Sequence, residues 1–71
     1  MKPEDIVPGG YYQITKNRVI HINLIYGGLT RINDVLYDVF DEYGKTLHHS
    51  LRRPLHNIAS FIEKRVKPRH K

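Results

Sequence analysis

The chain has 71 residues, of which 39% are apolar and 27% charged, and its formal net charge is +5. This length allows one domain, near the lower limit at which a core forms without disulfides or metals. Because there is no cysteine, disulfides, thiolate metal sites and cysteine nucleophiles are excluded. The absence of cysteine, of an apolar leader and of a long apolar run predicts a cytoplasmic protein that neither is exported nor spans a membrane.

Charge is divided unevenly along the chain. Residues 1–44 carry four Lys or Arg against six Asp or Glu, a net charge of −2. Residues 45–71 carry eight Lys or Arg against one Glu, a net charge of +7. A clustered positive field favours an anionic partner, which is a nucleic acid, an anionic membrane surface or an acidic protein face. The alternative is a solvated segment that serves solubility.

Three strands are predicted in the first forty residues. Residues 11–15 are strand formers that follow the turn signal at residues 8–10, and residues 19–26 alternate Ile20, Ile22, Leu24 and Tyr26 with the side chains between them. Residues 35–40 alternate in the same way. Residues 41–44 have the composition of a hairpin turn, so residues 45–51 are expected to return as a fourth strand of an antiparallel meander.

A carboxy-terminal amphipathic helix is predicted after Pro54, which is well placed in a first helical turn. The apolar residues that follow are spaced by three and four, which puts them on one stripe: Leu55, Ile58, Ala59, Ile62 and Val66. Pro68 ends this pattern. The sequence therefore predicts a single α+β domain over residues 1–66 and a flexible basic tail over residues 67–71.

Catalytic, cofactor and metal sites are not predicted. His48, His49 and His56 form the only group with metal-binding character, but adjacent strand residues point to opposite faces and no carboxylate completes a ligand set. The carboxylates of Asp38, Asp41 and Glu42 are typical of hairpin punctuation, and no nucleophile or phosphate-binding motif is present. We therefore expect a non-enzymatic protein without a cofactor.

Residues expected to contact a partner are basic or aromatic. The basic candidates are Arg52, Arg53, Lys64, Arg65, Lys67 and Arg69. Tyr11 and Tyr12 are adjacent on a strand, so one of them must face the surface. Phe61 lies beside the apolar stripe of the helix and either packs at its edge or is offered to a partner.

A strand meander that ends in Arg53-Pro54-Leu55 and an apolar run containing Phe61 resembles small SH3-like or open-barrel domains of bacterial and phage proteins. The size and the basic carboxy terminus are also similar to small phage-encoded regulators that bind host RNA polymerase. The resemblance implies a transcription regulator, in the host cytoplasm if phage-encoded, that binds a protein such as RNA polymerase with help from the basic segment. The alternative is direct, largely sequence-neutral binding to DNA or RNA.

Overall fold

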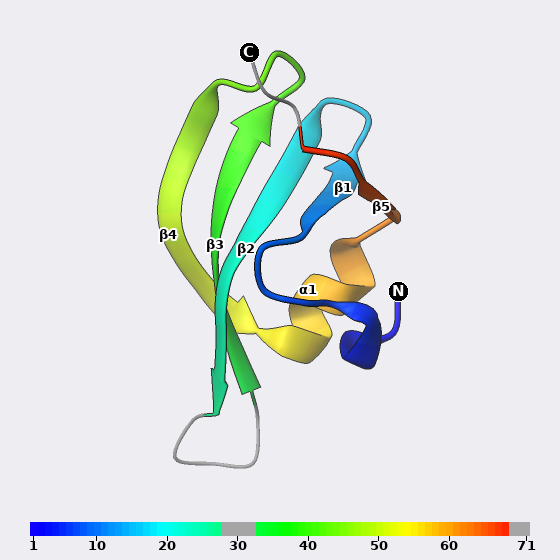
Figure 1. Ribbon diagram of the computed structural model, residues 1–71, viewed down its shortest axis with the longest axis vertical. Helices are drawn as coiled ribbons and strands as arrows, with labels where there is room; N and C mark the ends of the chain where they lie inside the picture. Colours follow the sequence, from blue (N-terminus) through cyan, green and yellow to red (C-terminus); the bar gives the residue numbers. More distant parts are fainter. Residues whose placement is uncertain (28–32, 69–71) are drawn as a thin grey trace.

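The computed structural model describes residues 1–27 and 33–68 of the chain, and these form an α+β structure with one antiparallel sheet. The elements, in chain order, are the 3-10 turn η1 (Pro3–Asp5), β1 (Tyr11–Thr15), β2 (Arg18–Gly27), β3 (Asn33–Asp41), β4 (Thr46–Pro54), α1 (Leu55–Phe61) and β5 (Lys64–Val66). The strands lie in the order β4-β3-β2-β1-β5, and α1 connects the two edge strands (Figure 1). The predicted α+β class with a helix after the meander is confirmed, but the sheet has five strands instead of four. No helix in the described part is long and apolar enough to cross a membrane.

The end of the helix was predicted wrongly. α1 stops at Phe61, and residues 64–66 are a strand that pairs with β1, with Val66 opposite Tyr11. The turn into β5 is fixed by a 2.8 Å hydrogen bond from the Glu63 amide to the Gln13 carbonyl. Without β5, the outer backbone groups of β1 would be left unpaired, and the sequence pattern around Val66 fits a strand as well as a helix.

β2 contains a bulge that changes which side chains face the core. Ile22 pairs with Tyr37 and Leu24 with Leu36, so Asn23 is an extra residue between them. A one-residue insertion reverses the alternation of faces. Leu24 is therefore 49% exposed, whereas Ile25 packs against the core. The predicted alternation is wrong from Asn23 onward.

The core lies between the sheet and α1. Its largest fully buried side chains are Tyr12, Ile20, Ile22, Val35 and Ile58. The amino-terminal segment also contributes, since Ile6 is buried and η1 contacts α1 (Figure 1). The Tyr12 hydroxyl accepts a 2.9 Å hydrogen bond from the Val7 amide and donates to the Asp5 carbonyl at 3.4 Å. These bonds tie the amino-terminal segment to β1.

β4 is a long edge strand with irregular pairing. Its register with β3 shifts twice, between Tyr37 and Val39 and between Val39 and Phe40. At the first shift Ser50 has a φ of 53°, and its amide donates a 2.8 Å hydrogen bond to the Asp38 carboxylate. Bulges of this kind disrupt the backbone template that an edge strand offers to other strands. The backbone of β4 is therefore a poor template for pairing with an additional strand.

Candidate functional site

β4 and α1 together present exposed apolar side chains. Leu51 pairs with Tyr37 and Arg53 with Val35, and both of these partners are core residues. Since paired residues of antiparallel strands point to the same face, Leu51 and Arg53 lie on the core-facing side of the sheet. Leu51 is 36% exposed and Phe61 of α1 is 49% exposed. We call Tyr37, Leu51, Arg53 and Phe61 the α1–β4 face.

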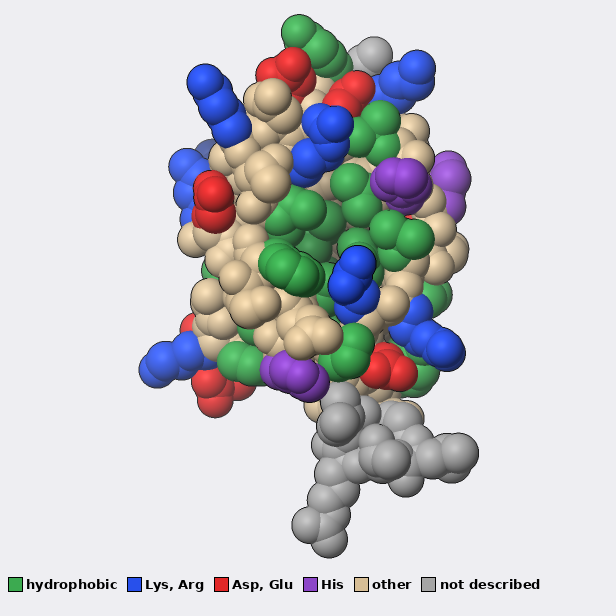
Figure 2. All heavy atoms as spheres, turned by 180° about the vertical axis from the view of Figure 1, so that it is seen from behind, with side chains coloured by type: hydrophobic (Ala, Val, Ile, Leu, Met, Phe, Trp, Pro, Cys, Tyr) green, Lys and Arg blue, Asp and Glu red, His purple; other side chains and the backbone are tan. Residues whose placement is uncertain are grey.

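Hydrophobic side chains are visibly grouped on the surface of the molecule. Figure 2 shows a cluster of them in the middle of one face, with a Lys or Arg side chain lying among them and charged side chains around the margin. Within the α1–β4 face, the guanidinium carbon of Arg53 lies 5.7 Å from the centre of the Phe61 ring. An apolar centre that contains an aromatic residue and an arginine, with a polar rim, is typical of protein-binding surfaces.

Arg53 is held in a defined orientation. Its Nε donates a 3.1 Å hydrogen bond to the hydroxyl of Tyr37, and its guanidinium faces the ring of Phe61. Tyr37 is only 5% exposed, so its hydroxyl is a fixed acceptor. The side chain of Arg53 therefore loses less conformational freedom on binding than an unsupported surface arginine.

Arg52 belongs to a different surface from Arg53. It pairs with Leu36 and lies on the opposite side of β4. A side-chain hydrogen bond with Tyr26 raises the pKa of Arg52, and the charge of Asp34 raises it further. The structure thus separates the predicted Arg52–Arg53 pair, since the two side chains lie on opposite sides of β4.

The carboxy-terminal cations lie at the other edge of the sheet. Lys64 and Arg65 are exposed on β5, and the Arg65 guanidinium carbon lies 5.9 Å from the centre of the Tyr12 ring. Lys67 is exposed just after β5, whereas Arg69 and the rest of the predicted tail, residues 69–71, lie outside the described residues. The predicted basic residues are therefore divided between two edges of the sheet.

The two adjacent tyrosines have different environments, as predicted. Tyr12 is fully buried, so its side chain belongs to the core and is removed from the surface on which a partner could be contacted. Tyr11 is half-buried on the opposite face of β1, with its ring centre 4.6 Å from His21 and 6.2 Å from Phe40. Tyr11 is thus the member of the pair that the surface presents.

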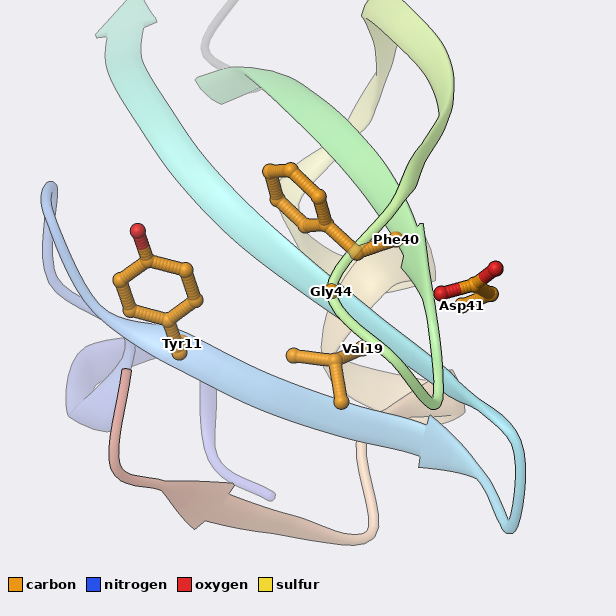
Figure 3. A pocket seen from close by; sticks show the side chains of 5 residues that line it. All are labelled: Tyr11, Val19, Phe40, Asp41 and Gly44. Carbon is orange, nitrogen blue, oxygen red and sulfur yellow. The ribbon is translucent and has the colours of Figure 1, made fainter. Parts of the chain in front are cut away.

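A small hollow is formed on this opposite face of the sheet. It has a volume of about 40 Å³ and is lined by Tyr11, Val19, Phe40, Asp41 and Gly44. Figure 3 shows the rings of Tyr11 and Phe40 on either side of it, with Val19 below and the Asp41 carboxylate pointing away. Ligand pockets usually have about 300–1,000 Å³, so the hollow is too small for a cofactor.

Asp41 has a structural role in the β3–β4 turn. Its Oδ1 accepts hydrogen bonds of 2.9 Å from the amides of Tyr43 and Lys45. The Lys45 hydrogen bond is the main cause that lowers the pKa of Asp41, the Tyr43 bond and the charges of Lys45 and Arg18 add to it, and partial desolvation opposes it. This geometry agrees with the interpretation of Asp41 as a hairpin residue. Among the described residues, no three His, Asp or Glu side chains are grouped so that they could hold a metal ion.

No family model, curated protein or solved structure matches the chain. The candidate surface therefore depends on the geometry of this molecule. The sequence pattern indicated Arg53 and Phe61 as candidates but did not indicate their neighbours Leu51 and Tyr37. No local signal connects Tyr37 with Arg53, because the two residues are sixteen positions apart and meet only through the β3–β4 pairing.

Proposed function

We propose that this protein is a non-enzymatic binding module whose α1–β4 face docks on an acidic surface of a partner protein. The observation that carries the proposal is the orientation of Arg53 between Tyr37 and Phe61, next to exposed Leu51. Arginine and aromatic residues at the centre of an apolar patch provide much of the energy in known protein interfaces.

The charge of the surrounding segment favours an acidic partner. Residues 46–62 include β4 and α1 and contain two arginines and three histidines but no Asp or Glu. Complementary charge accelerates encounter and selects against partners of the same sign. The segment thus combines apolar contact area with a positive field.

A narrower proposal is that the partner belongs to the transcription machinery, with RNA polymerase as the first candidate. It is supported by the small size of the protein and by its basic carboxy-terminal segment. We further propose that the fold is an SH3-like open barrel, because a short helix separates β4 from β5 and β5 pairs with β1. A regulator of this kind acts in the cytoplasm.

Binding to purified bacterial RNA polymerase tests both proposals. We expect Phe61→Ala to weaken binding about tenfold or more, the effect of losing a central contact. Leu24→Ala is the matched control, because Leu24 is also 49% exposed but lies in β2, beyond the bulge that turns it away from the core. Equal affinities of both variants and the wild type would contradict a role for the α1–β4 face, and absence of binding by the wild type would exclude RNA polymerase as the partner.

Direct nucleic-acid binding is the second candidate function. The observation in its favour is the exposed series of Lys64, Arg65 and Lys67 at the β5 edge. Binding through phosphate contacts makes the logarithm of affinity fall steeply with the logarithm of the salt concentration. A mobility-shift titration of wild type and a Lys64→Gln/Arg65→Gln variant decides the question, since micromolar, salt-sensitive binding lost in the variant would favour this candidate.

A further inference from the structure

The guanidinium of Arg53 has hydrogen-bonding capacity that the described residues do not use. A guanidinium carries five N–H donors, and the one on Nε bonds to Tyr37. Within residues 1–27 and 33–68, the four donors on the terminal nitrogens have no acidic partner. Arg53 thus presents a free, forked pair of nitrogens at the centre of an apolar face.

We propose that Arg53 is a carboxylate receptor, which binds one Asp or Glu side chain of the partner while an adjacent apolar side chain of that partner packs on Leu51 and Phe61. This inference rests on the proposed function and specifies what the α1–β4 face recognises. Two parallel N–H···O bonds join a guanidinium and a carboxylate in the geometry that arginine offers best.

Pre-organisation makes the site specific for a planar anion. The Tyr37 hydroxyl holds the Nε edge of the guanidinium, whose carbon lies over the Phe61 ring, so the terminal nitrogens are the edge left for a partner. A lysine at this position would keep the charge but would lose the planar set of donors and the Nε hydrogen bond to Tyr37.

The neighbourhood favours a single carboxylate over a nucleic-acid backbone. A phosphate chain is bound by several cations that follow its charges. The nearest arginine along β4, Arg52, lies on the opposite side of the strand, and Lys64 and Arg65 are on the other edge strand. One fixed cation beside exposed Leu51 and Phe61 fits an acidic residue flanked by apolar residues in a protein segment.

Peptide titration of the full chain tests the inference directly. The probes are two blocked peptides, acetyl-Leu-Glu-Leu-amide and acetyl-Leu-Gln-Leu-amide, and the signals followed by NMR are the Arg53 Nε–H and the Phe61 amide. We expect the Glu peptide to bind with a Kd of about 1 mM and the Gln peptide about tenfold more weakly. Shifts of the same size with both peptides would overturn the proposal, as would inorganic phosphate shifting the Arg53 signal at lower concentration than acetate.

Charge-conserving substitutions show whether the Glu peptide is bound by the Arg53 side chain itself or only by the overall positive charge. Arg53→Lys keeps the charge, and we expect it to weaken binding of the Glu peptide about fivefold or more. Arg52→Lys is the matched control on the other side of β4 and is expected to change the affinity less than about twofold. Tyr37→Phe removes only the hydroxyl that positions Arg53, so about threefold weaker binding is expected, with an Arg53 Nε–H signal that moves in the free protein.

The experiments test the carboxylate receptor at Arg53 separately from the docking of the α1–β4 face on RNA polymerase. If Phe61→Ala weakens binding to RNA polymerase but Arg53→Lys does not, the docking surface is retained and the carboxylate receptor is rejected. If the Glu peptide binds at Arg53 but RNA polymerase does not bind at all, the receptor is retained and that partner is rejected.

Discussion

β1 and β4 are strands of the same sheet with opposite properties. β1 has five residues, lies between β2 and β5, and contributes fully buried Tyr12. β4 has nine residues, lies at the edge beside β3, and has no fully buried side chain. The middle strands therefore supply much of the buried core, whereas β4 presents mainly exposed side chains, which include those of the proposed docking surface.

The largest expected change is in the free energy of unfolding, and it distinguishes a substitution in the core strand β2 from one in the edge strand β4. Ile22 of β2 is fully buried, so Ile22→Ala is expected to lower the free energy of unfolding by about 2–5 kcal/mol. Leu51→Ala on β4 should change it by about 0.5 kcal/mol or less. Urea denaturation followed by circular dichroism measures both. A similar loss for the two variants would show that β4 is as important to the core as β2.

A smaller loss of stability is expected at Gly10, just before β1, where the backbone lies close to the Tyr12 ring. A Cβ added at Gly10 would lie 2.7 Å from the Tyr12 hydroxyl and 2.8 Å from its Cε2. Because Tyr12 is buried and hydrogen-bonded, it cannot move aside, so Gly10→Ala should cost about 1–3 kcal/mol. Gly27→Ala is the control, since its Cβ would meet only Asn33 Oδ1 at 3.6 Å. Equal thermal midpoints of the two variants would contradict this explanation.

Replacing Ser50 in the β4 bulge by glycine should raise the stability of the protein. Ser50 has a φ of 53°, a conformation that costs a non-glycine residue about 1–2 kcal/mol. Ser50→Gly removes this strain and is expected to stabilise the protein by about 0.5–1 kcal/mol, after the greater flexibility of glycine in the unfolded chain is subtracted. Ser60→Gly, within α1, should instead destabilise it by about 0.5–1 kcal/mol. Destabilisation by both glycines would refute the assignment of strain to Ser50.

The smallest effect concerns acid sensitivity of the β3–β4 turn. The pKa of Asp41 is lowered from its ordinary value of 3.8, so its ionised form stabilises the fold above that value, and this contribution is lost as the pH falls through the folded-state pKa. Asp41→Asn keeps an oxygen acceptor for the amides of Tyr43 and Lys45 but removes the charge. We expect the urea midpoint of the variant to lie below that of the wild type at pH 7 and the two to converge in acid. A constant difference across pH would exclude a contribution from ionisation.

Sequence alone determined the elements that have strong local signals. Alternating apolar residues placed β2 and β3, the Asp41–Gly44 composition placed the turn, and Pro54 marked the start of α1. For the candidate surface, the sequence indicated Arg53 and Phe61 individually, without showing that they lie near each other. Such features could be predicted because side-chain period, turn chemistry and helix-starting residues act within a few positions of the chain.

Tertiary structure alone decided the features that depend on pairing between distant segments. Lys64–Val66 became a strand because β1 offered an edge, and the Asn23 bulge placed Leu24 and not Ile25 on the surface. The register of β4 put Arg52 and Arg53 on opposite sides and brought Arg53 to Tyr37. Local periodicity does not encode these choices, because strand register and bulges are set by which backbone groups and apolar faces the whole sheet must satisfy.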